Sequence, residues 1–168
     1  MDPGSKRLEN QDFDVTPLTN LPNSMPGYSW NIKIAAEVID AYGHVNNVAY
    51  VQWMQDIAIQ HTQSVGGDRV ANQAGIMWVV KSHEVEYLRQ AFEGETLQLE
   101  TFIEDTQRAT SVRRTVFTRM EDQKVVARGR THWVCLDKAT GRPRAIPDEV
   151  MNAYDQPTNG NQTTKNHE

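Results

Sequence analysis

The patterned part of the chain begins with a strict alternation of hydrophobic residues with polar or small ones. The apolar positions are Tyr28, Trp30, Ile32, Ile34, Ala36 and Val38. Because side chains of a β-strand point alternately to opposite faces of a sheet, a period of two predicts a half-buried strand. We therefore expect one antiparallel strand from Tyr28 to Val38.

A helical period replaces this alternation between Val48 and Val65. Apolar residues recur there every three or four positions, at Tyr50, Trp53, Met54, Ile57, Ala58, His61 and Val65, and Val48, Val51 and Ile59 widen the apolar arc. A helix that is apolar around most of its circumference is expected to be enclosed by other elements. Asn46 or Asn47 is the expected N-cap, and Gly66-Gly67 is the expected end.

Four further strand patterns follow the helix, separated by short turn-like segments. They run from Ile76 to Tyr87, Glu95 to Asp105, Ser111 to Met120 and Val125 to Asp137. In the first of them Val79, Val85 and Tyr87 are expected on one face. A short helix from Asp148 to Tyr154 is expected to close the domain. This order predicts an α+β fold, with an antiparallel sheet of about five strands wrapped around one long central helix.

Polar segments flank this region at both ends of the 168-residue chain. Residues 1–24 and 155–168 are rich in Asn, Asp, Gln, Thr, Pro and Lys and have no sustained apolar period. Such segments are expected to be disordered, because they bury too little apolar surface to offset the loss of conformational entropy. We therefore expect a single domain over residues 25–154.

Charge and cysteine content limit the partners and the compartment. The net charge of −5 argues against a nucleic-acid-binding protein, which would need a basic surface. Arginines between Arg108 and Arg130 are expected to lie on a solvated sheet face, with at most a phosphate-contacting subset. One cysteine, Cys135, permits no intrachain disulfide and favours a reducing compartment. Without an apolar signal segment or a membrane-length apolar run, we expect a cytoplasmic protein that does not bind membranes.

The segment from Asp40 to Asn47, between the first strand and the helix, is dense in polar side chains. It contains Asp40, His44, Asn46 and Asn47 around a glycine. A helix N-terminus presents free backbone N–H groups and the positive end of the helix dipole. A carboxylate beside it suits attack on an ester or thioester. The amides would stabilise the oxyanion, and Asp40 would act as the nucleophile or as the base that activates water.

A structural role is the alternative for part of this segment. Asp, Gly and Asn are common in turns and helix caps, and Gly43 suits a backbone conformation that other residues resist. Turn and capping chemistry accounts at least partly for Gly43, Asn46 and Asn47. It does not account as well for a carboxylate and an imidazole in the same turn.

A resemblance to a known family lies in this segment. Its run Asp40-Ala41-Tyr42-Gly43-His44-Val45-Asn46-Asn47-Val48-Ala49-Tyr50, with Trp53 after it, resembles the signature of the hot-dog-fold acyl-CoA thioesterases. The most similar branch contains the 4-hydroxybenzoyl-CoA thioesterase-like and acyl-ACP thioesterase-like proteins. Weaker matches extend the resemblance from Tyr28 to Val150, including Gly75-Ile76, Val85 to Tyr87, Gly94 to Leu97 and Arg144 to Pro147.

The resemblance implies a role for individual residues. Asp40 matches the catalytic carboxylate, and the backbone N–H of Asn47 matches the donor that polarises the thioester carbonyl. His44 and Asn46 match positions that shape the catalytic site. Substrate-binding positions are expected at Gly43, Val48, Tyr50, Trp53 and Trp78. The candidates for contact with the coenzyme A phosphates are Arg89, Arg128 and Arg130, and the sequence does not decide among them.

The resemblance also implies an assembly and a cofactor requirement. The minimal unit would be a homodimer, often paired into a dimer of dimers, with active sites at the subunit interface. No metal or redox cofactor would be needed, and coenzyme A would arrive as part of the substrate. No two histidines have the spacing of zinc ligands, which agrees with this expectation.

Two departures from the family pattern affect the residues around the site. A second acid often lies two residues before the catalytic one, where this chain has Val38. The helix acid of the family appears here only as Gln55-Asp56, followed by Ile57 and Ala58. Another hot-dog branch uses a helix carboxylate, so Asp56 is the alternative to Asp40.

Hydrolysis of an acyl-CoA or acyl-carrier-protein thioester, releasing a free acid and a thiol, is the function that the sequence favours. A non-catalytic acyl-CoA-binding protein, acting as a sensor or carrier, is the first alternative. A hydratase or dehydratase would need an acid–base pair over the acyl β-carbon, which Asp40 and His44 would have to form. Free thiol would identify hydrolysis, and loss of enoyl absorbance would identify hydration.

Overall fold

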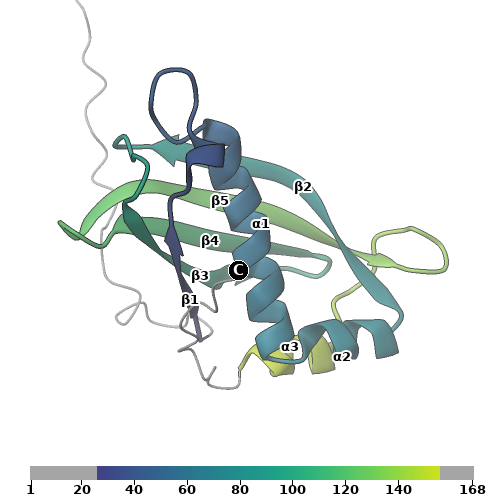
Figure 1. Cartoon of the computed structure of the whole chain (residues 1–168). Coiled ribbons are helices and arrows are strands. Elements are labelled where there is room, and N and C mark those ends of the chain that lie inside the picture. The colour runs from purple at the N-terminus through teal and green to yellow at the C-terminus, as the bar shows by residue number, and fades with distance from the viewer. Residues whose placement is uncertain (1–25, 156–168) are drawn as a thin grey trace, which may run out of the picture.

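The computed structural model describes residues 26–155, and the predictions for residues 1–24 and for the tail after Asp155 lie outside this range. Within it, five strands form one sheet with helices on it (Figure 1). The elements in chain order are β1 Tyr28–Lys33, the 3-10 helix η2 Ala36–Val38, α1 Asn47–Ser64, α2 Gly67–Gln73, β2 Ile76–Tyr87, β3 Thr96–Thr106, β4 Thr110–Arg119, β5 Lys124–Asp137 and α3 Asp148–Tyr154.

The sheet is antiparallel and has the strand order β1-β3-β4-β5-β2. α1 crosses it and contacts β1, β2, β3 and β5, while α2 and α3 lie side by side at the C-terminal end of α1 (Figure 1). The predicted α+β fold, with a five-stranded sheet around one long helix, is confirmed. β1 and β2 are the two edges of the sheet, and the end of β2 lies beside the start of α1.

The first strand is shorter than the alternation predicts. β1 ends at Lys33, and the chain continues as η2 from Ala36 to Val38. The last residue pair between β1 and β3 joins Lys33 to Thr96, where β3 begins. Since a strand needs a partner for its backbone groups, the alternation beyond Lys33 has no neighbouring strand to extend.

A bulge in β2 corrects the predicted face of that strand. The pairing of β2 with β5 shifts register between Val80 and Ser82, so that one extra residue enters β2. Such an insertion reverses which alternate side chains face inward. Ile76 and Trp78 pack on the inner side before the bulge, whereas Val85 does so after it. Val79 therefore does not share a face with Val85 and Tyr87.

The helix ends where it was predicted to end, but a second helix follows that the sequence did not reveal. Gly66 adopts a left-handed conformation with φ of 68° and separates α1 from α2. α2 begins at once, at Gly67, because its first turn packs against α1 and Tyr154 of α3. Asp148–Tyr154 forms the short closing helix that was predicted.

The core has two parts, and α1 is less enclosed than its apolar arc predicts. The larger part joins α1 to β1, β3, β4 and β5, with Met54, Ile57 and Phe117 among its buried residues. The smaller part lies under α2 and α3. Val48 and Ile59, by contrast, are 71% and 52% exposed. None of the helices in residues 26–155 combines the length and apolar character that a membrane span requires.

Candidate functional site

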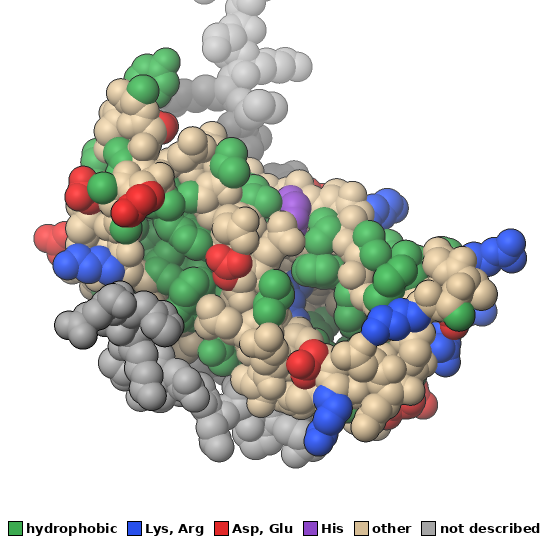
Figure 2. Space-filling view, turned by 45° about the vertical axis from the view of Figure 1, so that its right-hand side comes forward, with side chains coloured by type: hydrophobic (Ala, Val, Ile, Leu, Met, Phe, Trp, Pro, Cys, Tyr) green, Lys and Arg blue, Asp and Glu red, His purple; other side chains and the backbone are tan. Residues whose placement is uncertain are grey.

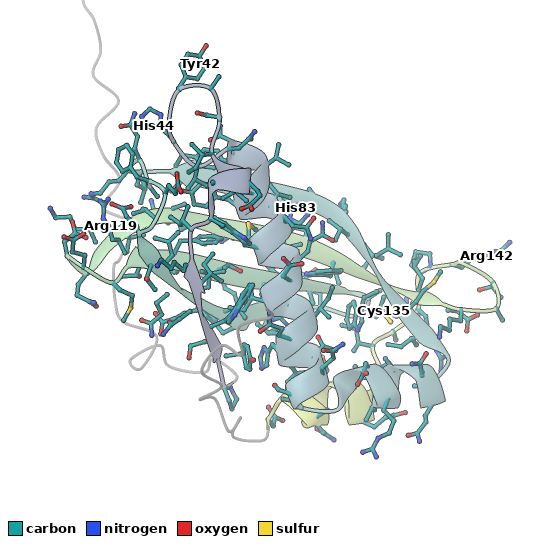
Figure 3. The ribbon with its side chains drawn as sticks, viewed as in Figure 1. Tyr42, His44, His83, Arg119, Cys135 and Arg142 are labelled. Carbon is teal, nitrogen blue, oxygen red and sulfur yellow. The ribbon has the colours of Figure 1, made fainter. Side chains whose placement is uncertain are left out.

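The loop between η2 and α1 closes on itself through backbone hydrogen bonds. The N–H of Asp40 donates to the carbonyl of His44 at 2.8 Å, and the N–H of Gly43 donates to the carbonyl of Asp40 at 3.0 Å. Gly43 has φ of 83°, which favours glycine at this turn. Tyr42 is 85% exposed and points away from the domain at the tip of the loop (Figure 3).

One oxygen of the Asp40 carboxylate holds this loop in place. Oδ1 accepts hydrogen bonds from the backbone N–H groups of Tyr42, at 2.8 Å, and His44, at 3.3 Å. No residue in the described range donates to Oδ2. The carboxylate is therefore oriented through one oxygen, while the other has no donor in the described range.

The start of α1 lies beside this carboxylate. The side chain of Asn46 accepts from the N–H of Val48 at 3.0 Å, so that Asn46 rather than Asn47 is the N-cap. Asn47 is the first helical residue, and its backbone N–H has no acceptor among residues 26–155. That N–H stands at the positive end of an 18-residue helix.

Asp40 and Asn47 line one cavity of about 320 Å³ at this end of α1. Its lining residues are Asp40, His44, Val45, Asn47, Tyr50, Tyr87, Leu88, Arg89, Gln90 and Ala91. The hydroxyl of Tyr87 donates to the carbonyl of Asn47 at 3.1 Å, which joins the end of β2 to the start of the helix. The chain therefore brings a carboxylate, an imidazole and a free backbone amide to one surface.

The segment from Tyr87 to Ala91 is also part of the cavity, and the sequence indicated only Arg89 of it, as a candidate for phosphate contact. It follows β2 and reaches the loop because the N–H of Val45 donates to the carbonyl of Ala91 at 3.0 Å. Arg89 lines the cavity and donates from Nη1 to the carbonyl of Val125 at 2.6 Å. No local motif marks this segment, since its position depends on pairing between distant parts of the chain.

Two of the predicted site residues contribute aromatic rings. His44 packs edge-on against Phe92, with 5.4 Å between the ring centroids, and it lies at the base of the loop (Figure 3). Tyr50 lines the cavity and packs edge-on against Phe117 at 5.2 Å. Burial is the main cause that raises the pKa of Tyr50 to about 12, so its hydroxyl is a donor at neutral pH.

The remaining predicted positions do not line this cavity. Gly43 shapes the loop, Asn46 caps the helix, and Val48 is exposed on the outer side of α1. Trp53 packs edge-on against Tyr50 at 5.4 Å in the core. Their predicted contact with the substrate therefore has no support within one chain.

Trp78 lies in a second cavity, of about 380 Å³, at the other end of α1. The lining residues of this second cavity are Gln55, Ala58, Ile59, Thr62, Gln63, Asp68, Trp78, Ile103, Ser111, Arg113, Trp133, Met151 and Tyr154. From Asn47 to Thr62 a helix rises roughly 22 Å, at 1.5 Å per residue. Within one chain Trp78 is therefore remote from Asp40.

Several other candidate groups have structural environments. Asp56 accepts from Nε2 of Gln52 at 2.8 Å and lines neither of these cavities. Cys135 is buried, and burial raises the pKa of its thiol. Arg114 and Arg130 pair with Glu104, so much of the basic cluster is neutralised by acidic side chains on the sheet face. Within residues 26–155 no group of His, Cys, Asp or Glu side chains has the arrangement of a metal site.

A family model and a characterised protein match most of this domain. The model of the thioesterase-like superfamily matches residues 34–154. The long-chain acyl-CoA thioesterase FadM of Escherichia coli is 22% identical over 125 residues, which covers 74% of this chain and 95% of FadM.

Solved structures share the fold. The probable thioesterase YbaW from Escherichia coli superposes with a TM-score of 0.72 at 21% identity, over 78% of this chain and 98% of that one. Slr0204, a 1,4-dihydroxy-2-naphthoyl-CoA thioesterase from Synechocystis, superposes with a TM-score of 0.69 at 15% identity, over 78% of this chain and 99% of that one. Together with the family model, this fold shows that the chain belongs to the thioesterase-like superfamily.

Proposed function

We propose that the protein hydrolyses an acyl thioester, of coenzyme A or of an acyl-carrier protein, to a free acid and a thiol. The observation that carries this proposal is the shared cavity of the Asp40 carboxylate and the free N–H of Asn47 at the start of α1. FadM, whose sequence is similar over 125 residues, is a long-chain acyl-CoA thioesterase. Membership of the thioesterase-like superfamily supports the same reaction class.

The proposed reaction uses the helix end for charge and Asp40 for attack. The thioester carbonyl oxygen accepts from the Asn47 N–H, and the helix dipole stabilises the negative charge that develops on it. If Asp40 acts as base, it takes a proton from water, the water oxygen bonds to the carbonyl carbon, and the carbon–sulfur bond breaks. The thiolate then takes up the proton. If Asp40 acts as nucleophile, its carboxylate oxygen bonds to the carbonyl carbon and the carbon–sulfur bond breaks, which releases the thiolate and leaves an acyl anhydride on Asp40. Water then cleaves the anhydride, which frees the acid and restores Asp40, and the thiolate takes up the proton that the water releases.

Other residues at the site would support this chemistry without reacting. His44 would shape the acyl entrance, as Phe92 holds its ring and its backbone N–H orients Asp40. Asn46 would keep the helix end in place through its cap. A carboxylate and an oxyanion donor form a sufficient set for a thiolate leaving group, so we propose that no metal or redox cofactor takes part and that coenzyme A enters only with the substrate.

We further propose a homodimer joined through β2, with two such dimers as the alternative tetrameric assembly. β2 is a sheet edge of 12 residues, and an exposed edge can pair with a second copy. Val48 and Ile59 are eleven positions apart, about three turns, and therefore lie on the same exposed side of α1. A second helix packed there would cover both.

Such a dimer would unite the two cavities. Antiparallel pairing of two β2 strands about their centre sets Tyr87 of one copy beside Ile76 of the other. Tyr87 adjoins the Asp40 cavity, and Trp78 lines the second cavity. The second cavity of one subunit would thus open beside the catalytic end of its partner.

We also propose that the protein is cytoplasmic and that it binds neither nucleic acid nor membranes.

The test is thiol release from a panel of short, medium, long and aromatic acyl-CoAs, with wild type and Asp40→Asn in parallel. Asn can still accept from the N–H groups of Tyr42 and His44, so the variant keeps the loop. We expect the rate to fall by roughly 10²–10⁴-fold. Asp56→Asn is the matched control, and we expect it to retain activity.

Each contrary outcome identifies another function. Activity that survives in Asp40→Asn and disappears in Asp56→Asn would move the catalytic role to the helix. Binding of acyl-CoA without thiol release would identify a binding protein. Loss of enoyl absorbance without thiol release would identify a hydratase.

A further inference from the structure

A buried arginine lines the second cavity. Arg113 belongs to β4, where Ser111, Arg113, Thr115 and Phe117 form the inward-facing row and Arg113 is only 5% exposed. The row faces α1, so the strand pattern would lead one to expect an apolar side chain there. Figure 2 shows a hollow on one face of the molecule, with hydrophobic side chains at its border and Lys or Arg side-chain atoms inside it. Among the residues that line the second cavity, Arg113 is the basic one.

The partners of Arg113 are neutral. Its Nη1 donates to Nδ1 of His61 at 2.9 Å and to the hydroxyl of Thr101 at 3.3 Å. Its guanidinium lies over the Tyr154 ring, 5.9 Å from the centroid. His61 is neutral, because burial and the neighbouring guanidinium lower its pKa to about 3. No carboxylate within residues 26–155 forms an ion pair with Arg113.

A buried charge without a counter-ion is costly, and this cost indicates what the cavity would bind. Burial lowers the pKa of Arg113, but a guanidinium remains protonated at neutral pH. Removing such a charge from water costs several kcal/mol unless an opposite charge replaces the lost hydration. Asp68 lines the cavity but is exposed and does not pair with Arg113. An anion that enters the cavity would therefore gain a strong, desolvated partner.

Two further buried N–H groups in this part of the molecule lack an acceptor among the described residues. Since Nδ1 of His61 accepts, its Nε2 carries the hydrogen, and this buried N–H has no acceptor within residues 26–155. The indole N–H of Trp133, a lining residue, is likewise buried without an acceptor in that range. The lining also contains apolar and aromatic side chains, among them Ala58, Ile59 and Trp78, beside polar side chains of α1. The cavity thus offers apolar surface to an acyl chain and the N–H groups of Arg113 and Trp133 to an anion.

We propose that Arg113 is a specificity residue, and that the second cavity receives an acyl chain whose far end carries a carboxylate. The preferred substrate would then be a monothioester of a dicarboxylic acid. This inference rests on the proposed function, with the thioester held at the partner's catalytic end and the chain extending into the second cavity. A volume of about 380 Å³ falls within the range of small-molecule sites. A methyl-ended chain would leave the guanidinium unpaired, and such unpaired polar groups discriminate strongly.

The experiment compares acyl-CoAs of equal length that end in a methyl or a carboxylate group, such as octanoyl-CoA and suberoyl-CoA. We expect wild type to have at least a tenfold higher kcat/KM for the carboxylate-ended substrate. Arg113→Met should lower that value at least a hundredfold and raise the value for octanoyl-CoA, reversing the preference. Arg113→Lys keeps the charge but not the two parallel donors of a guanidinium, so its kcat/KM for suberoyl-CoA should lie between those of wild type and Arg113→Met. Equal losses for both substrates, or no preference in wild type, would overturn the proposal.

Two controls separate specificity from folding and from the reaction itself. Arg114→Met removes a neighbouring arginine that pairs with Glu104, and we expect the substrate ratio to stay at the wild-type value. Calorimetric binding of both acyl-CoAs to Asp40→Asn needs no turnover. If no thiol is released but the carboxylate preference appears in binding and vanishes on adding Arg113→Met, the specificity holds and hydrolysis fails. Hydrolysis of both substrates with equal kcat/KM would instead support the proposed function and overturn the specificity.

Discussion

The polar groups at the two ends of α1 differ in their distance along the sequence and in their burial. At the N-terminal end, Asp40 and Asn47 lie close in sequence, partly open to water, and local backbone hydrogen bonds hold them. At the C-terminal end, Arg113 and His61 come from distant elements and are buried against each other. The first arrangement can act on charge that develops during a reaction. The second holds a permanent charge that can select among ligands.

This contrast suits the two ends of α1 to different tasks, catalysis at one end and selection among acyl chains at the other. Catalysis needs groups that stabilise the transition state more than the ground state, and a helix end with a free amide does so. Selection among acyl chains needs a group that is penalised when its partner is missing, and a buried guanidinium is such a group. In the proposed dimer each active site would take its reacting groups from one subunit and its selecting group from the other.

The largest of these effects is expected from separating the two subunits, because the catalytic end of one subunit would then lose the second cavity of its partner. Ile59→Glu places a charge on the exposed apolar side of α1, where the partner helix would pack and where Ile59 also lines the second cavity, so the molecular mass is the readout that reports on the dimer. We expect dissociation to monomers and a loss of roughly 10²-fold or more in thioesterase activity, as catalytic misplacement of this kind typically costs. Light scattering measures the mass, and thiol release measures the activity. Met120→Glu, at an exposed apolar position in the β4–β5 turn, is the matched control. A fully active monomer would contradict the shared site.

The second prediction concerns the buried end alone. The pKa of His61 is about 3 in the folded protein, below its ordinary value of 6.5. Below pH 6.5 the unfolded chain binds a proton that the folded protein excludes, so stability falls as the pH drops from 6.5 towards 3. We expect a loss of about 2 kcal/mol between pH 7 and pH 5. Urea unfolding of wild type and His61→Gln, whose amide oxygen can still accept from Arg113, measures the difference. Equal pH dependence in both proteins would show that His61 does not cause it.

The smallest effect is expected at the catalytic end. Asn46→Ala removes the side-chain acceptor for the N–H of Val48, and loss of an N-cap costs about 1 kcal/mol. Thermal unfolding should show a decrease of a few degrees in Tm. Asn47→Ala, one position later, removes an exposed side chain that caps nothing, and its Tm should match wild type. A larger loss in Asn47→Ala would show that the cap is misassigned.

Local signals sufficed for most elements of the fold. The bounds of β2 agree with the predicted strand, and α1 runs from Asn47 to Ser64, one residue from the prediction at each end. Both follow from side-chain periods, which depend only on near neighbours in the sequence. The end of β1 and the bulge in β2 were not predictable, because each depends on where the partner strand begins or shifts.

The same distinction holds for the site. A contiguous motif indicated the Asp40 loop and the helix end, and the structure brings Asp40, His44, Asn47 and Tyr50 to one cavity. The sequence did not place the segment from Tyr87 to Ala91 beside the Asp40 loop, although it indicated Arg89 as a candidate for phosphate contact, and it did not reveal the burial of Arg113. Arg113 belongs to a run of arginines that reads as a solvated face, and only the pairing of β4 with its neighbours turns this one inward.

The sequence by itself determined the five strands, the long helix and the closing helix in their order, the capped helix start and the carboxylate beside it, because local periods and local hydrogen bonds specify these features. Only the tertiary structure decided which residues join that carboxylate, that α1 leaves one apolar side exposed, and that Arg113 is buried with a neutral histidine. Those features arise from strand register and packing between segments far apart in the chain. Register has a period of two, so a shift of one residue decides whether an arginine faces water or the interior.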